Sequence, residues 1–253
     1  TLTSEGAIGQ SGAITADALD VSSTGGAITL DDTGNAFNTL TVSTTGSDGA
    51  DVYDTSAVTV ASATVGGTFT LTSEGAIGQS GAITADALDV SSTGGAITLD
   101  DTGNAFNTLT VSTTGSDGAD VYDTSAVTIA SATVGGTFTL TSEGAIGQSG
   151  AITADALDVS STGGAITLDD TGNAFNALTV STTGSDGADV YDTSAITIAS
   201  ATVGGTFTLT SEDAIGQSGA ITADALDVSS TGGAITLDDT GNAFNTLTVS
   251  TTD

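Results

Sequence analysis

The segment TLTSEGAIGQSGAITADALDVSSTGGAITL begins at Thr1 and returns, almost unchanged, at Thr70, Thr139 and Thr208. The period of 69 residues divides the chain into copies at 1–69, 70–138, 139–207 and 208–253, the last of them shorter. A fixed period of this kind is typical of an array in which each unit stacks on its neighbours. We therefore expect a single continuous array over residues 1–253, as a segment of a longer polypeptide.

The local pattern within each copy predicts strands. TFTLTS at 68–73, ALDVSS at 87–92 and TLTVST at 108–113 alternate apolar and polar residues with a period of two. Thr, Val and Ile are β-branched and favour a pleated surface. We expect the frequent glycines to supply turns with positive φ, at Gly75, Gly78, Gly81, Gly94, Gly95 and Gly103. No segment has a sustained helical period, so the chain is expected to be all-β.

The spacing of apolar pairs favours a parallel β-helix, or β-solenoid, with about three rungs per repeat. The pairs begin at Phe69, Leu88, Leu109 and Phe138, at intervals of 19, 21 and 29 residues. Stacked rungs would place these four residues in one interior ladder, with Leu71, Val90 and Val111 in a second and Thr70, Asp89 and Thr110 facing outward. An array of β-sandwiches is the alternative, but its hairpins favour Asn-Gly or Asp-Gly turns. The second copy has only one such pair, Asp117-Gly118.

The few substitutions between copies agree with this assignment of faces. Val60 becomes Ile129 and Ile198, and Val58 becomes Ile196, so predicted inward sites stay apolar and β-branched. Gly6 becomes Asp213 at a predicted turn. We expect this change to be accepted because Asp adopts left-handed backbone conformations more readily than most residues.

GTFTLTSEGAIGQSGAITADALDVSSTGGAITLDDTGNAFNTLTV resembles the repeats of filamentous haemagglutinin-type surface proteins. The resemblance lies in the spacing of G-A-I, A-L-x-V and G-A-I-T-L and extends over the whole chain. It implies a right-handed β-helix, an extracellular or cell-surface location, and a role in adhesion. The family's N-terminal secretion domain is not present in this sequence.

Charge sets the kinds of partner that the chain is expected to have. It carries 31 acidic residues and no Lys, Arg or His, for a net charge of −31. At one rung per about 4.8 Å, this is about one negative charge per 1.7 Å of axis, comparable to duplex DNA. We expect a cation atmosphere and contacts with further copies of the chain, by axial continuation or lateral bundling. Nucleic acid is not expected as a partner, because no cationic side chain is present to meet a phosphate. No apolar run is long enough for membrane insertion.

One stretch is close to a metal-binding motif. GSDGADVYD at 115–123 approaches the calcium-binding nonapeptide G-G-x-G-x-D-x-U-x, although the residues that follow do not repeat it. Two interpretations stay open, a polar turn and a Ca²⁺ site. The candidate ligands are Asp117, Asp120 and Asp123, with copies Asp48, Asp51 and Asp54 and copies Asp186, Asp189 and Asp192. No other cofactor is expected. The adjacent pair Asp100-Asp101 is expected to lie in a solvated turn.

Catalysis is not expected. His, Lys, Arg and Cys are absent, so the usual bases, activated nucleophiles and cationic oxyanion donors are lacking. Paired carboxylates could cleave a glycoside, but no aromatic platform for sugar is evident. Ice binding would need T-x-T on successive rungs, and Asp89 and Ser91 interrupt that array. We expect a structural rod or filament segment of a very long bacterial surface protein. The alternative is an adhesin shaft that binds Ca²⁺ or a surface glycan through its acidic faces.

Overall fold

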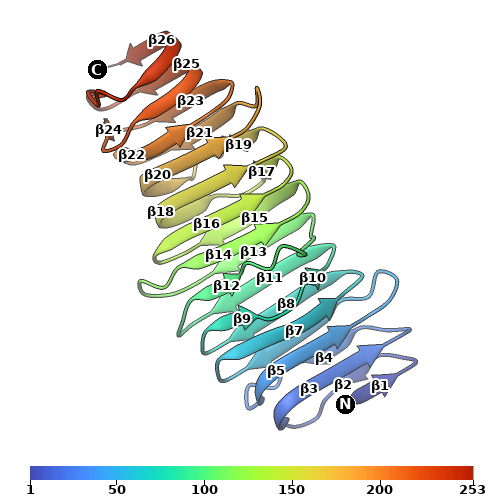
Figure 1. Ribbon diagram of the computed structural model, residues 1–253. Coiled ribbons are helices and arrows are strands. Elements are labelled where there is room, and N and C mark those ends of the chain that lie inside the picture. The colour runs from blue at the N-terminus through green and yellow to red at the C-terminus, as the bar shows by residue number, and fades with distance from the viewer. Residues whose placement is uncertain (253) are drawn as a thin grey trace. The chain divides into compact units, whose positions relative to one another are not determined.

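The computed structural model describes residues 1–252, which form only strands, turns and bends. The chain divides into two compact units, Thr1–Thr124 and Ser125–Asp253, and each is considered by itself. In each unit, strands run side by side in successive rungs (Figure 1). The expectation of one continuous solenoid over all four repeats stays a prediction.

The strands of the first unit are short, with two to nine residues each. They are β1 (Leu2–Ser4), β2 (Ile8–Gly9), β3 (Thr15–Ser23), β4 (Ile28–Leu30), β5 (Ala36–Ser43), β6 (Ala50–Asp54), β7 (Val58–Thr64), β8 (Thr68–Ser73), β9 (Ile77–Gln79), β10 (Ile83–Thr84), β11 (Ala87–Ser92), β12 (Ile97–Leu99), β13 (Thr108–Ser112) and β14 (Ala119–Asp123).

The second unit repeats the pattern with strands of three to ten residues. They are β15 (Val127–Thr133), β16 (Thr137–Ser142), β17 (Ile146–Gln148), β18 (Ile152–Ser161), β19 (Ile166–Leu168), β20 (Ala174–Thr182), β21 (Ala188–Asp192), β22 (Ile196–Thr202), β23 (Thr206–Ser211), β24 (Ile215–Gln217), β25 (Ile221–Ser230) and β26 (Ala243–Thr251).

Parallel pairing in both units confirms the predicted β-solenoid. In the first unit β1, β3, β5 and β7 pair in succession, and β2, β4, β6 and β8 form a second succession. The chain thus alternates between two ladders of stacked strands. Each rung contributes one strand to each ladder, and the register places like positions of neighbouring rungs beside each other.

An odd number of strands per repeat decides how the copies stack. The first copy contains seven strands, β1 to β7, and β8 is the counterpart of β1 in the second copy. Because seven is odd, β1 lies in one ladder and β8 in the other. The same exchange occurs in the second unit, where β16 pairs with β18 and its counterpart β23 pairs with β21. The prediction of about three rungs per repeat is confirmed, and the alternation gives three and a half.

The register confirms one predicted ladder and corrects its continuation. Phe69 pairs with Leu88, and Leu88 pairs with Leu109, as expected. The same strands align Leu71, Val90 and Val111. The step of 29 residues from Leu109 to Phe138 is wrong, as the equivalent residues of the first copy show.

In that copy the equivalent of Leu109 is Leu40, which pairs with Val60, whereas Phe69 pairs with Ala50. Strand β6 provides an additional half rung that the apolar spacing does not reveal. Val58–Val60, expected in the same rung as Leu40, therefore stacks on the next rung instead.

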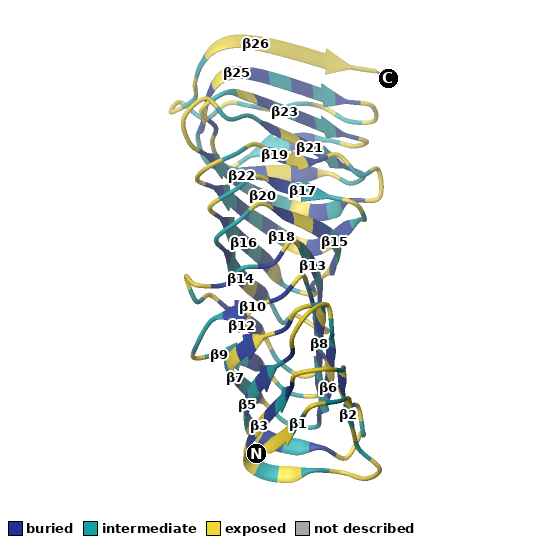
Figure 2. Cartoon of the chain, turned by 90° about the vertical axis from the view of Figure 1, so that its right-hand side faces the viewer, coloured by how far each residue is buried: buried dark blue, intermediate teal, exposed yellow. Residues whose placement is uncertain are grey.

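Apolar side chains fill the interior of both units. Phe69, Leu109 and Phe138 have no exposed surface and Leu88 has 1%. Buried and more exposed residues alternate along the strands, whereas β26 is mostly exposed (Figure 2). The sites substituted between copies, Val58 and Val60 among them, are buried in every copy that varies them. The outward assignment of Thr70, Asp89 and Thr110 is also confirmed, since each is only partly buried.

The glycines act mainly by permitting close approach, which corrects the expectation of positive φ. Among the described residues, positive φ occurs only at Gly46, Gly115 and Gly184. None of the six glycines expected to have it does. At Gly94, a Cβ would collide with the carbonyl oxygen of Glu74 on the preceding rung. Small residues are thus needed where one turn passes closely over another.

Asp213 likewise does not have positive φ, so the expected reason for accepting it is wrong. Its Oδ1 instead accepts a hydrogen bond from the backbone N–H of Ala214 at 2.7 Å. At the equivalent Gly144, a Cβ would crowd the backbone of Ala126. The last copy therefore accommodates a side chain that the equivalent turn does not admit without a shift.

We predict that Phe138→Ala lowers the free energy of unfolding by about 3–5 kcal/mol, because it empties a fully buried site. Phe244→Ala is the matched control, since Phe244 is only partly buried on β26. Urea unfolding followed by circular dichroism measures both. Equal losses at the two positions would contradict the interior assignment of Phe138.

Candidate functional site

The described residues do not concentrate chemistry at one place. Residues 1–252 enclose no pocket, and no three acidic side chains within that range are grouped so that they could hold a metal ion. No helix in this part of the chain is long and apolar enough to cross a membrane. The candidate sites are therefore the repeated turns, the buried polar corners and the outward columns of side chains.

The predicted calcium motif begins in a tight turn. In the first copy, Gly46 has a φ of 64°, and the backbone N–H of Asp48 donates to the carbonyl of Thr45 at 3.2 Å. The hydroxyl of Thr44 donates to the carbonyl of Asp48 at 2.6 Å. A glycine with positive φ at the second position is typical of a type I′ or II′ turn. The hydrogen bonds of this turn are thus satisfied within the chain.

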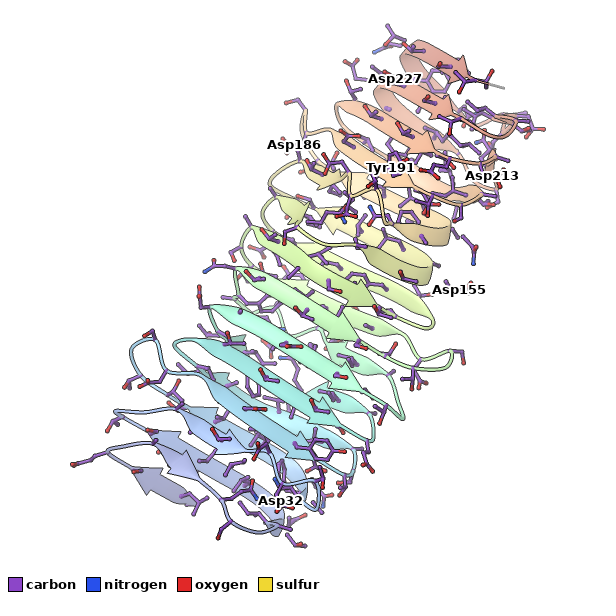
Figure 3. All side chains as sticks on the ribbon, turned by 180° about the vertical axis from the view of Figure 1, so that it is seen from behind. Asp32, Asp155, Asp186, Tyr191, Asp213 and Asp227 are labelled. Atoms are coloured by element: carbon purple, nitrogen blue, oxygen red, sulfur yellow. The ribbon has the colours of Figure 1, made fainter. Side chains whose placement is uncertain are left out.

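The structure does not bring the three predicted ligands of a copy together. Asp51 and Asp54 both belong to β6, but Asp51 is exposed whereas Asp54 is completely buried. Three positions along a strand separate them, so their side chains leave opposite faces. Asp120 and Asp189 are likewise exposed, and Asp123 and Asp192 are buried. Asp117 is only partly buried in the turn before β14, and Asp186 lies in a turn before β21 (Figure 3).

The buried aspartate stabilises the joint between two rungs. Oδ2 of Asp54 accepts a hydrogen bond from the backbone N–H of Phe37 at 2.8 Å. Oδ1 accepts from the backbone N–H of Ser56 at 2.6 Å and from its hydroxyl at 2.7 Å. Phe37 lies on β5 before the point where β7 begins to pair, at Thr39. The carboxylate therefore takes the place of a missing strand carbonyl.

A buried asparagine organises the neighbouring corner. Oδ1 of Asn35 accepts from the backbone N–H of Ile14 and from the side chain of Gln10, both at 2.8 Å. Its amide donates to the carbonyl of Leu30 at 2.9 Å and to Oε1 of Gln10 at 3.0 Å. The same partners recur around Asn104 and Asn173. These side chains are saturated, so we assign them to the scaffold.

The adjacent acidic pair also lies in a turn, as expected. Oδ1 of Asp101 accepts from the backbone N–H of Gly103 at 2.8 Å, and Asp100 is exposed. At the equivalent position in the first copy, Asp32 accepts from Gly34 at 2.9 Å. The pair thus shapes the loop that leads into the buried asparagine.

The outward carboxylates form columns in which acids alternate with threonine. The register aligns Thr29, Asp51, Thr70, Asp89 and Thr110 across five strands of the first unit. Burial raises the pKa of Asp89, and the charge of Asp51 two rungs away raises it further. Burial also raises the pKa of Asp51, with a smaller contribution from Asp31. The threonine between them keeps the carboxylates about 9.6 Å apart.

The second unit has the same electrostatics. Burial raises the pKa of Asp189, and the charges of Asp169 and Asp227 add to the effect. Burial raises the pKa of the interior Asp192 as well, although hydrogen bonds from Ser194 and Phe175 oppose the change. Tyr191 lies on the outward face of β21 and donates to Oε1 of Glu212 at 2.7 Å. That hydrogen bond is the main reason why the pKa of Tyr191 is raised.

Sequence reasoning missed the buried corner residues. The signal was available, because Asp-x-Ser is the pattern of an Asx turn, in which the carboxylate accepts from the backbone two residues on. Asp54-Thr55-Ser56 has this form. The periodic pattern alone could not show that the carboxylate also reaches Phe37 on the preceding rung.

The fold and the repeated columns define a parallel β-solenoid repeat protein. A family profile described as Repeats of unknown function (DUF5649) matches residues 1–44, 48–113, 117–182 and 186–251, and the chain belongs to this family. The family matches recur at the 69-residue spacing. A search of curated proteins found no match, and a search of solved structures found none.

We predict that Asp54→Ala lowers the free energy of unfolding by about 1–3 kcal/mol, because it leaves buried donors on Phe37 and Ser56 without an acceptor. Asp51→Ala is the control on the same strand, since its side chain is exposed. Urea unfolding measures both variants at pH 7. If the two substitutions have the same effect, the corner carboxylate does not stabilise the joint.

We predict that stability rises as the pH falls from 7 toward about 4 at low salt. The folded-state pKa is raised at Asp51, Asp89, Asp120, Asp189 and Asp192. A pKa above that of the unfolded chain means that the folded state binds protons first, so the destabilisation is relieved through this window. Burial is the main cause, whereas mutual repulsion alone was expected.

Thermal melts at intervals between pH 7 and pH 4 check this dependence. Asp89→Asn should raise the melting temperature at pH 7 and make its rise on acidification smaller. A melting temperature that falls steadily on acidification would show that the carboxylates are stabilised in their charged form.

Proposed function

We propose that the chain is a structural segment of a very long repetitive bacterial surface protein, an extracellular rod or filament without catalysis of its own. The observation that carries the proposal is where the polar groups lie. Asn35 and Asp54 and their copies are buried and saturated by the scaffold, and the outward columns repeat hydroxyls and carboxylates without a distinct centre. A repeated scaffold of this kind can supply length and a uniform surface.

Three further features support a passive, polyanionic role. The absence of His, Lys, Arg and Cys removes the residues on which most acid–base and nucleophilic catalysis depends. The same absence removes the contacts that phosphate groups require, so nucleic acid is not proposed as a partner. The resemblance to filamentous haemagglutinin-type proteins supports the extracellular or cell-surface location. Cations and further copies of the chain are the proposed partners.

We predict that self-association of the whole chain at pH 7 follows ionic strength smoothly, because salt screens the repulsion between copies. Light scattering during NaCl and CaCl₂ titrations at matched ionic strength measures the response. Similar curves for the two salts support the passive polyanion. Asp120→Asn serves as a control, and it should shift both curves equally.

Sharp, saturable bundling with CaCl₂ alone would instead favour the adhesin shaft with ordered calcium sites. In that case Asp120→Asn should weaken the response to calcium and leave the response to NaCl unchanged.

A further inference from the structure

One outward column in each unit has the same alternating chemistry. In the first unit it consists of Thr29, Asp51, Thr70, Asp89 and Thr110, on β4, β6, β8, β11 and β13. The corresponding column of the second unit consists of Thr167, Asp189, Thr208, Asp227 and Thr248. We name each of these the Thr–Asp column. Hydrogen-bond donors and acceptors thus alternate along it at one per rung, about 4.8 Å apart.

The residues beside the column keep the face rich in hydroxyls. On β8 and β13, Thr70 and Thr110 lie between outward Thr or Ser residues, and neither strand carries a charge. On β11, Ala87 and Ser91 flank Asp89. Tyr191 and Asp227 lie on the corresponding face of the second unit (Figure 3). Large or cationic side chains therefore do not interrupt the approach of a flat partner.

The side chains of the column do not use their hydrogen-bonding capacity within the chain. In the described structure, none of these five residues of the first unit has a side-chain hydrogen bond to another residue, whereas every buried polar side chain in residues 1–252 has one. The threonine hydroxyls and aspartate carboxylates consequently remain available to a partner.

We propose that the Thr–Asp column is a self-docking face, which binds the Thr–Asp column of a second copy of this chain. When two columns face each other in antiparallel directions and one is offset by a rung, Thr70 of one copy lies opposite Asp89 of the other, and Asp89 lies opposite Thr70. Each threonine hydroxyl then donates to a carboxylate. Such a two-fold contact uses the same patch on both copies.

Hydrogen-bond complementarity is what selects a second copy as the occupant. A cationic partner would leave the threonines unused, and an apolar partner would leave the carboxylates unpaired. An unshifted contact places carboxylate against carboxylate, so the offset of one rung is the arrangement that avoids repulsion. The docking face would be the lateral step of the assembly proposed above, and it depends on that structural role.

Acidity controls whether the contact forms. The charged groups that face Asp89 are those of Asp51 and, farther along, Asp31, while β8 and β13 contribute hydroxyls only. Because burial raises the pKa of Asp51 and Asp89, these groups take up protons early as the pH falls. The net charge of −31 opposes association at pH 7. Lateral pairing should therefore appear on mild acidification at low salt.

Sedimentation velocity of the whole chain at pH 7 and pH 4.5 in low salt tests the face. The wild-type chain should be monomeric at pH 7 and should associate at pH 4.5. The double variant Thr70→Val, Thr208→Val keeps the shape of the side chains but removes one hydroxyl from each column. It should associate at least tenfold more weakly at pH 4.5.

The matched control is Thr84→Val, Thr222→Val, which alters exposed threonines outside the two columns. This control should associate like the wild-type chain. The gain-of-function variant Asp89→Asn, Asp227→Asn retains an acceptor without charge, and it should associate already at pH 7. Circular dichroism melts check that all variants are folded.

A wild-type chain that stays monomeric at pH 4.5, or equal association of the two threonine double variants, would overturn the proposal. Either result would leave the salt titration of the structural role unaffected. Loss of the smooth response to ionic strength, in contrast, would count against the structural role itself.

Discussion

Backbone hydrogen bonds between parallel rungs are the interaction on which the rest of this structure depends. The chain has no disulfide and no cationic side chain, so neither covalent links nor ion pairs between side chains can hold the rungs together. The parallel register of β6, β8, β11 and β13 aligns Ala50, Phe69, Leu88 and Leu109 in one buried column. The same register aligns the outward side chains, so core and surface are periodic for one reason.

Seven strands per repeat is the second constraint, and it concerns the surface more than the core. Each copy ends half a rung out of phase with its start, so β1 and its counterpart β8 belong to different ladders. The interior tolerates this exchange because both ladders are lined with Val, Ile, Leu, Ala and Phe. The outer faces consequently receive the same sequence only in alternate copies.

Polar residues divide into two groups with different physical roles. The corner residues Asn35 and Asp54 are buried, and they satisfy backbone groups at points where strand pairing is interrupted. The acids on the strand faces, such as Asp51 and Asp89, are spaced by threonines, and partial burial raises their pKa. A carboxylate in this chain is therefore either a structural acceptor or part of an unpaired outward column. The two groups are only three residues apart on β6.

The sequence by itself determined the all-β class, the repeat of 69 residues, the inward positions of Phe69, Leu88 and Leu109, and the outward position of Asp89. These features follow from local periodicity, because side chains alternate along a strand wherever it lies. Only the tertiary structure decided that Leu40 stacks on Val60 and Phe69 on Ala50, since register depends on how far the chain travels around each rung. It also decided that Asp51 faces solvent while Asp54 is buried. The physical reason is that a carboxylate can be buried only where other segments supply donors, and the donor on Phe37 belongs to another rung.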